Sequence, residues 1–194
     1  MSMRYKGGVI SATSPTVVGP TDGEGGSASG MWTLAEVMVH EKASNWPKPV
    51  LPRELWMWGY NTTGQLGHGN TTGLSSPVQV GALTDWSGVV AGVAMTIAIK
   101  TDGSLWSWGK NTDGQLGDGS TTARSSPVQV GALTDWSVLS PGGAWVSAIK
   151  TDGTLWTWGY NAWGQLGNGA VATISSPIQV GALTTWSVIG NGFG

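Results

Sequence analysis

The sequence contains no cysteine, a single phenylalanine and little charge. Without cysteine, disulfide bonds, thiol catalysis and cysteine-ligated zinc sites are excluded. Charged residues make up only 10% of the 194 residues, and the formal net charge is −2 with no basic run. Such a chain has little attraction for phosphates, so we expect no nucleic-acid partner. No stretch approaches the roughly 20 apolar residues of a membrane helix, so we expect no membrane span.

Tryptophan and glycine, by contrast, are abundant, with 13 and 32 residues. Many of them belong to one stretch, Leu-Trp-x-Trp-Gly followed by Gly-Gln-Leu-Gly, which begins at Leu55, Leu105 and Leu155. A fixed period of 50 residues indicates a repeat architecture. In such an architecture each unit is one supersecondary element that cannot bury its apolar surface alone.

Each repeat contains several short strands. Residues 95–100 alternate as a strand, 101–103 form a tight Thr-Asp-Gly turn, and 104–108 return with both tryptophans on one face. Further short strands are predicted over 126–130 and 136–139. This spacing is typical of one four-stranded propeller blade per repeat, so the predicted fold class is all-β. The paired tryptophans are then interpreted as filling the space between blades, and a carbohydrate-stacking platform is the alternative.

The first part of the chain has a different composition. Residues 1–30 are rich in glycine and serine and predict an extended leader. Thr33 and Glu36 form a capping box, with Trp32 and Val37 placed as a hydrophobic staple. We expect a short helix over 34–43, too short to be stable alone and therefore docked on the propeller or on another protein. The predicted organisation is leader 1–47, proline-rich connector 48–54 and three repeats over 55–194, the last incomplete.

The repeat resembles a known family. Trp-x-Trp-Gly-x-Asn-x-x-Gly-Gln-Leu-Gly-x-Gly, then Pro-x-x-Val, a strand and Thr-Asp-Gly, is similar to the regulator of chromosome condensation repeat over residues 55–194. The resemblance implies β-propeller blades, in a family that usually forms seven of them. Its founding member is a nucleotide exchange factor on chromatin, but the loops that carry that activity have no match here. The resemblance therefore implies the fold and a binding scaffold, and not the exchange activity.

The leader has a resemblance of its own. Residues 5–13, 29–34 and 46–47 are similar to the N-termini of many predicted marine phage structural proteins, in which a shared leader precedes different C-terminal domains. The resemblance implies an anchor to the virion that carries an exchangeable display domain. The expected contacts with a partner chain come from the large side chains of the leader: Tyr5, Val9, Ile10, Trp32, Leu34, Val37, Met38 and Trp46.

The repeats form about three blades of an incomplete or longer propeller. The last repeat stops before the equivalent of residues 145–150, and residues 46–54 do not supply that strand to the first. Closed propellers have four to eight blades, so three units leave an apolar face open. The chain is then the N-terminal piece of a longer protein, which we favour, or several chains close the ring, or the leader covers the open face.

No enzyme site, cofactor site or metal site is predicted. The two histidines, His40 and His68, lie in different regions, and most aspartates occupy equivalent repeat positions, which favours a structural role. The run Asn111-x-Asp113-Gly114 resembles the start of a calcium loop but lacks the further ligands and the terminal glutamate.

Comparison of the repeats separates constant from variable positions. Variable residues on a rigid repeated framework are candidates for a surface that binds a ligand or receptor. Tyr160 and Trp163 together could stack on a sugar ring or a protein partner. Tolerated loop variation is the alternative. The candidate residues are Tyr60, His68, Lys110, Arg124, Tyr160 and Trp163.

Two functions follow as hypotheses. The first is a non-enzymatic phage virion protein, a tail fibre or decoration and attachment protein, oligomeric and located in the virion. Its leader would bind other virion proteins, and its repeats would bind a host glycan or surface protein. The alternative is a cytoplasmic protein-interaction scaffold of the chromosome-condensation repeat type.

Overall fold

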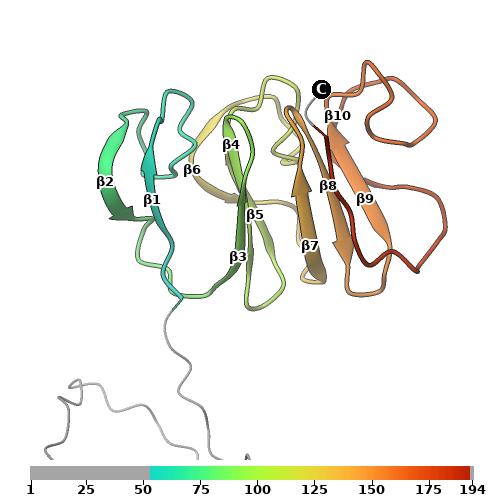
Figure 1. Ribbon diagram of the computed structural model, residues 1–194, viewed down its shortest axis with the longest axis horizontal. Helices are drawn as coiled ribbons and strands as arrows, with labels where there is room; N and C mark the ends of the chain where they lie inside the picture. The colour runs from blue at the N-terminus through green and yellow to red at the C-terminus, as the bar shows by residue number, and fades with distance from the viewer. Residues whose placement is uncertain (1–52, 193–194) are drawn as a thin grey trace, which may run out of the picture. The chain divides into compact units, whose positions relative to one another are not determined.

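The computed structural model describes residues 53–192, which form ten β-strands in three antiparallel sheets (Figure 1). The predicted leader and its helix over 34–43 lie outside this range. Within it, no helix is long and apolar enough to cross a membrane. The strands are β1 Trp56–Gly59, β2 Leu74–Gln79, β3 Trp86–Ala91, β4 Met95–Lys100, β5 Leu105–Gly109, β6 Arg124–Gln129, β7 Trp136–Pro141, β8 Trp145–Lys150, β9 Leu155–Gly159 and β10 Ile174–Gln179.

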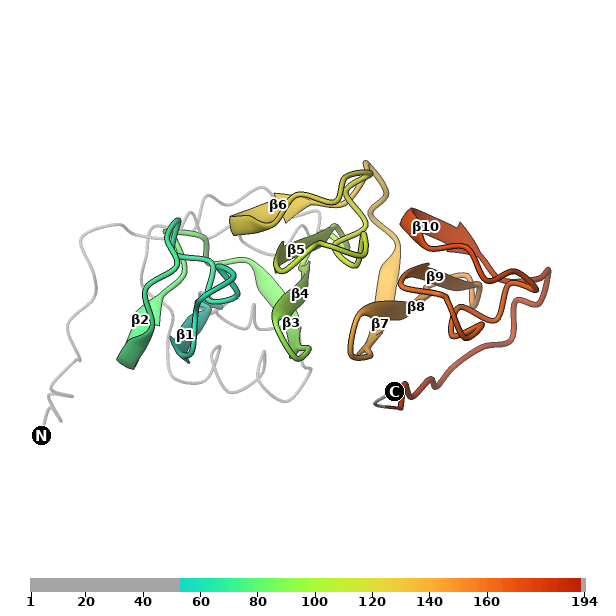
Figure 2. The ribbon, with the colours of Figure 1, turned by 90° about the horizontal axis from the view of Figure 1, so that it is seen from above.

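Two of the sheets are complete four-stranded blades, which confirms the predicted all-β propeller repeats. The first blade has the order β3-β4-β5-β6 and the second the order β7-β8-β9-β10, while β1 and β2 form a half-blade. Each blade begins one strand before the tryptophan hairpin: β7 pairs with β8 of the following hairpin and not with β6. The blades are therefore offset from the 50-residue sequence repeat. In Figure 2, β3 and β7 lie on one side of the array, and β6 and β10 lie on the other.

The predicted hairpin turn is confirmed at residues 101–103. Gly103 has a φ of +80°, and a Cβ there would overlap the Thr134 carbonyl, so only glycine fits. The Asp102 carboxylate accepts hydrogen bonds from the Ser104 hydroxyl and N–H, at 2.6 and 2.9 Å. These bonds lower the pKa of Asp102 below its usual value. The same arrangement recurs at Asp152, where Thr154 takes the place of Ser104.

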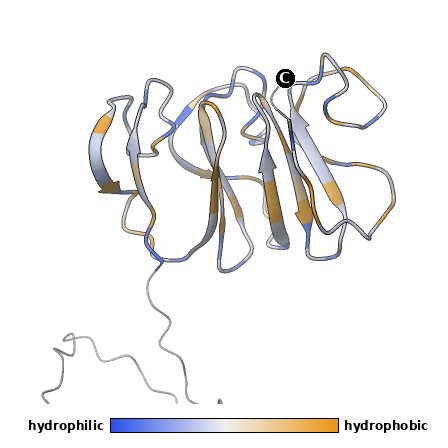
Figure 3. Ribbon diagram, in the orientation of Figure 1, coloured by the Kyte–Doolittle hydropathy of each residue, from blue (hydrophilic) through white to orange (hydrophobic). Residues whose placement is uncertain are grey.

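The core lies between the sheets, as the paired tryptophans predicted. One cluster joins the half-blade to the first blade and contains Trp86 and the fully buried Trp108. A second joins the two blades and contains Trp136 and Trp158. The Trp86 ring meets Trp108 at a centroid distance of 5.8 Å, and Trp136 meets Trp158 at 6.0 Å. Figure 3 shows hydrophobic residues along β4, β7 and β8, three of the strands that contribute to this second cluster.

A buried lysine completes each of the two blades. Lys100 is 7% exposed, and its Nζ lies 3.2 Å from the Asp85 carboxylate and 4.3 Å from the centre of the Trp106 ring. Lys150 repeats this arrangement with Asp135. Desolvated lysines persist only when paired, and the carboxylate and the aromatic face together provide that pairing. The equivalent aspartates are thus structural, as their repetition indicated.

Candidate binding surface

Three long loops gather at one edge of the array. They follow β1, β5 and β9, cover residues 60–73, 110–123 and 160–173, and lie at the top of Figure 1. We call them the first, second and third loops. All the predicted ligand-binding residues belong to these loops except Arg124, which begins β6.

A buried asparagine holds each loop from inside. In the second loop the Asn111 amide donates to the Ser120 and Thr122 carbonyls at 3.1 and 3.0 Å, and its oxygen accepts the Leu116 N–H at 2.9 Å. Asn61 and Asn161 make equivalent bonds in the other loops. All three are at most 1% exposed. Sequence reasoning missed this role, although the recurrence of asparagine at the same place in every repeat was the signal.

The backbone carbonyl of a glutamine, four residues after the asparagine, connects each of the first two loops to the following blade. The Gln65 carbonyl accepts a 2.9 Å bond from the Trp108 indole N–H and a 2.8 Å bond from the Thr96 hydroxyl. The Gln115 carbonyl accepts the Trp158 indole N–H at 2.9 Å. These contacts make the loops part of the core structure, so they form a firm framework for the side chains on their outer surface.

Four of the predicted ligand-binding residues lie on the outer side of this framework. Tyr60 and Trp163 are 73% and 84% exposed, and Tyr160 and Lys110 are half-buried. Lys110 Nζ lies 4.0 Å from the Asp113 carboxylate. Tyr160 and Trp163 belong to the same third loop, whereas Tyr60 belongs to the first. The arrangement offers aromatic surface on separate loops, which suits contact with an extended partner.

Arg124 is partly exposed and forms an ion pair with an aspartate of the second loop. Its Nε and Nη2 both lie 2.9 Å from Asp118 Oδ2, and the Asp118 side chain is 3% exposed. Burial raises the pKa of Asp118, but hydrogen bonds from Ser120 and Arg124 outweigh it and hold the pKa below its usual value. Arg124 therefore stabilises the second loop. Among residues 53–192, no three or more His, Asp or Glu side chains gather in a way that could hold a metal ion.

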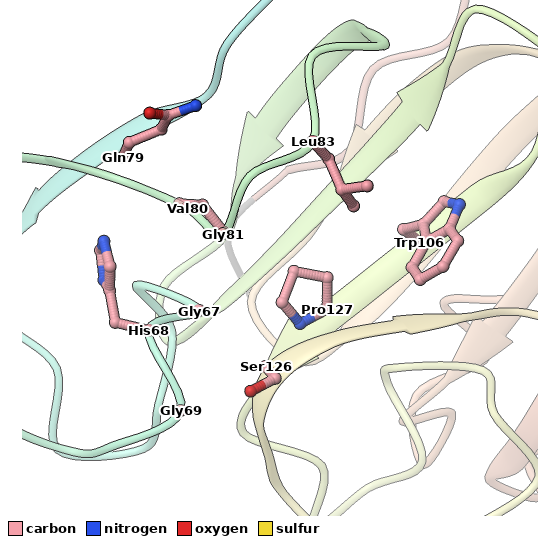
Figure 4. A pocket seen from close by; sticks show the side chains of 10 residues that line it. All are labelled: Gly67, His68, Gly69, Gln79, Val80, Gly81, Leu83, Trp106, Ser126 and Pro127. Atoms are coloured by element: carbon pink, nitrogen blue, oxygen red, sulfur yellow. The ribbon is translucent and has the colours of Figure 1, made fainter.

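His68 lines a cavity of about 370 Å³ between the half-blade and the first blade (Figure 4). Its Nε2 lies 3.1 Å from the Val78 carbonyl, so the ring donates there when Nε2 carries the proton. Its Nδ1 is buried and has no hydrogen-bond partner. The apolar part of the wall is formed by Val80, Leu83, Trp106 and Pro127. The cavity could accept a small apolar group.

Two groups of predicted residues are therefore separate in space. The exposed loop residues lie at the outer edge, and His68 lies in the cavity between sheets. The predicted anchor residues, from Tyr5 to Trp46, lie outside the described range, so their role stays a prediction.

The comparison with protein families gives one consistent result. The pattern of the regulator of chromosome condensation (RCC1) repeat matches residues 54–99, 102–146 and 152–190, and a second pattern of the same repeat matches 86–115. The matched segments cover more than half of the chain and coincide with the strands described above. Among curated proteins, no match is found.

Solved structures show the same fold. Prp20p from Saccharomyces cerevisiae, studied for its binding to Gsp1p and histones, is 20% identical with a TM-score of 0.64 over 72% of this chain and 38% of its own. Yeast RCC1 (Prp20) bound to Kap60 is 20% identical with a TM-score of 0.59 over 68% and 34%. This chain spans little more than a third of the length of these relatives.

Proposed function

Because the chain belongs to the regulator of chromosome condensation repeat family, we propose that it is a non-enzymatic binding protein that presents its three loops to a partner. The observation that carries this proposal is the construction of the loops. Buried asparagines fix the backbone, and the residues that differ between repeats, such as Tyr60 and Trp163, face solvent. Exposed aromatics on a rigid support are typical of protein-binding surfaces.

The charged side chains support a binding role over catalysis. Arg124, Lys100 and Lys150 are each paired with an aspartate, and these pairs hold a loop or a blade together. An acid–base mechanism needs a titratable group within reach of a substrate. These three ion pairs instead stabilise the fold.

We propose further that the chain is a phage virion structural protein, a tail fibre or a decoration protein. The support is the leader, whose residues 5–13 and 29–34 resemble those of phage structural proteins. In this arrangement the leader binds other virion proteins, and the repeats form the exchangeable domain that faces a host glycan or surface protein.

The anchor is tested by incorporation into particles. Full-length chains carrying Leu34→Asp or Val37→Asp are supplied during phage assembly, and copies per purified particle are counted by quantitative mass spectrometry. We expect at least a tenfold loss, because a charge at an apolar docking position opposes burial. Ser27→Ala in the same leader is the control. Normal incorporation of both aspartate variants would contradict the anchor.

The display surface is tested by adsorption to host cells. Tyr160→Ala and Trp163→Ala should each reduce adsorption of particles, because each removes aromatic contact area from the third loop. Val171→Ala, at a 68% exposed position of the same loop, is the matched control. Unchanged adsorption of both aromatic variants would show that the loop does not bind the receptor.

A cytoplasmic protein-interaction scaffold is the second candidate. It is favoured by the structural likeness to Prp20p, whose structures were studied with Gsp1p, histones and Kap60 as partners. This function requires a protein partner for the loops in the cell and predicts that leader substitutions have no effect on binding. The two aspartate variants of the leader therefore distinguish the candidates.

A further inference from the structure

Among residues 53–192, the contact between the half-blade and the first blade and the contact between the two blades follow one template. In each, the second tryptophan of a Trp-x-Trp-Gly strand lies on the Gly-Gln-Leu-Gly loop of the preceding unit. Trp108 donates to the Gln65 carbonyl and Trp158 to the Gln115 carbonyl, both at 2.9 Å. Both tryptophans are fully buried. A further contact of this kind therefore requires a tryptophan indole N–H that donates to the glutamine carbonyl of the loop.

The loop glycines make the fit close. A Cβ on Gly67 would lie 2.8 Å from the Trp108 ring nitrogen, and one on Gly117 would lie 2.7 Å from that of Trp158. A second strand seals each contact, since the Gly119 N–H donates to the Ser175 carbonyl at 2.8 Å. The equivalent bond from Gly69 to Ser125 is 2.7 Å. The loops therefore accept an indole ring and one serine-containing strand, and larger side chains at the glycines would prevent both.

The third loop has this shape but no occupant among residues 53–192. A Cβ placed on Gly164, Gly167 or Gly169 would meet nothing within 4 Å. Gln165 is half-buried, whereas Gln115 at the equivalent place is 1% exposed. We call residues 164–169 the open loop. The third loop has a buried asparagine and a buried leucine, Asn161 and Leu166, at the same positions as the two occupied loops.

The half-blade, at the opposite end of the repeats, exposes the tryptophan and the serine that correspond to those bound by the occupied loops. Trp58 has the same place in its strand as Trp108 and Trp158, yet it is 58% exposed, and no unit precedes it among the described residues. Ser75, which corresponds to Ser125 and Ser175, is also exposed. The half-blade thus presents the indole and the strand that the open loop lacks.

Residues 186–191, close to the end of the described range, extend beyond the second blade in the way that β7 extends beyond the first. The Trp186 N–H donates to the Gly153 carbonyl at 3.1 Å, as the Trp136 N–H at the start of β7 donates to Gly103 at 3.2 Å. Further along, the Asn191 amide donates to the Ser140 carbonyl at 2.6 Å. Residues 186–191 therefore occupy the position of the first strand of a next blade. The half-blade has the third and fourth strands of such a blade, while residues 53–192 leave its second strand, the equivalent of β8, unsupplied. A contact between the two ends therefore depends on the open loop, Trp58 and the strand that contains Ser75.

We propose that the open loop of one copy binds the half-blade of a second copy of this chain. In that contact the Trp58 indole N–H donates to the Gln165 carbonyl, and the Gly169 N–H donates to the Ser75 carbonyl. Because the contact joins different surfaces, it is head-to-tail. Each copy offers one open loop and one half-blade among residues 53–192, so two copies joined through both contacts form a closed dimer.

The association is measured by sedimentation velocity of the full 194-residue chain over a concentration series. We expect a dimer, and at least tenfold weaker association for Trp58→Ala and for Gly167→Asn. Gly167 has a φ of +63°, which asparagine tolerates, and the free loop has room for its side chain. Val171→Ala is the control, and thermal melting verifies that each variant folds. A monomeric wild type, or a dimer that both variants leave unchanged, would overturn the proposal.

Mixing the two variants tests the head-to-tail geometry. Trp58→Ala keeps an intact open loop, and Gly167→Asn keeps an intact half-blade, so an equimolar mixture should form a one-to-one heterodimer that neither forms alone. No heterodimer would overturn the proposal, as would self-association of either variant at wild-type strength.

A disulfide test locates the contact in a chain that has no cysteine. A Cβ on Gly119 lies 3.6 Å from the Ser176 hydroxyl, so Gly169 should lie equally close to Ser76 of the second copy. Mixed Gly169→Cys and Ser76→Cys chains should form a cross-linked dimer on mild oxidation. Gly169→Cys mixed with Ser126→Cys is the control, because Ser126 already contacts Gly69 of its own chain. Equal cross-linking of both mixtures, or none of either, would contradict the contact.

Discussion

Trp58 and Trp108 occupy the same position of the same motif, but one is 58% exposed and the other is fully buried. Each is the last residue but one of a short strand that ends at a glycine, and each strand is followed by a loop held by a buried asparagine. The difference is the neighbour: a preceding unit covers Trp108, and none among the described residues covers Trp58. Local sequence therefore determines the strand and the loop, while the adjacent unit determines whether the tryptophan belongs to a core.

The loops show the same contrast at the other end. The second loop contacts the Trp158 ring and the Ser175 strand, and Gly114 and Gly117 are buried there. The third loop has the same internal bonds, but Gly167 is exposed. A repeat can thus complete its internal hydrogen bonds alone and still leave its apolar contacts unmade. Substitution of one member of each such pair therefore separates the contribution of the local sequence from that of the neighbouring unit.

The largest difference in the free energy of unfolding is expected between the Trp108→Ala and Trp58→Ala variants. Removing a buried tryptophan side chain costs about 3–5 kcal/mol, because it opens a cavity and removes one of the two hydrogen bonds to the Gln65 carbonyl. In dilute monomer, Trp58→Ala should change the free energy of unfolding by less than about 0.5 kcal/mol. Urea denaturation measures both. Equal losses would show that Trp58 is buried in the isolated chain.

Replacing a buried asparagine should also lower the free energy of unfolding more in a loop that a neighbouring unit covers than in the third loop. Asn111→Ala leaves the Leu116 N–H and two carbonyls without partners, and we expect a loss of about 3 kcal/mol in the free energy of unfolding. Asn161→Ala breaks equivalent bonds in the loop that has no neighbour, where water can replace them, so we expect about half that loss. Chemical denaturation of the two variants side by side is the measurement. A larger loss for Asn161→Ala would contradict this reasoning.

Acid should weaken the second loop more than the third. The folded-state pKa of Asp118 lies below the value of about 4 for an unfolded chain, so its stabilisation is complete above that pH and is lost as the pH falls through the lower, folded value. Asp118→Asn should lower the free energy of unfolding by about 1–2 kcal/mol at pH 7. It should also make the loss of stability below about pH 4 less steep. Asp102 and Asp152 retain part of the acid dependence, since their pKa values are lowered too.

The smallest effect is expected at Trp163. It is 84% exposed, so Trp163→Ala should leave the melting temperature of dilute monomer within about a degree of the wild type. Differential scanning calorimetry makes this measurement. A melting temperature lowered by several degrees would show that the ring packs on the protein and is not available to a partner.

Much of the fold could be predicted from the residues. The 50-residue period and the Thr-Asp-Gly turn are confirmed, since these features depend on local spacing and on glycine conformation. The packing of paired tryptophans between sheets is confirmed in the second and third repeats, whereas Trp56 and Trp58 of the first repeat are exposed. The offset between repeat and blade could not be predicted from the period, because a period gives no starting point. The pairing of β7 with β8 decides that question.

The candidate site was predicted less completely. Arg124 was interpreted as a possible ligand-binding residue, yet it pairs with Asp118. The sequence did contain a signal for this pair. The aspartate and the arginine occur together in the second repeat only, and the same two positions hold His68 and Leu74 in the first repeat and Asn168 and Ile174 in the third. The exposure of Trp58 had no local signal, since its motif is identical to that of the buried tryptophans.

Hydrogen exchange of the tryptophan indole N–H groups, followed by NMR on the full chain, tests the central comparison most directly. We expect the Trp108 and Trp158 indoles to be protected at every protein concentration, because each donates to a buried carbonyl. The Trp58 indole should exchange rapidly in dilute solution and become protected as the concentration rises and copies associate. Protection of Trp58 in dilute monomer, or rapid exchange of Trp58 in the associated state, would contradict the account.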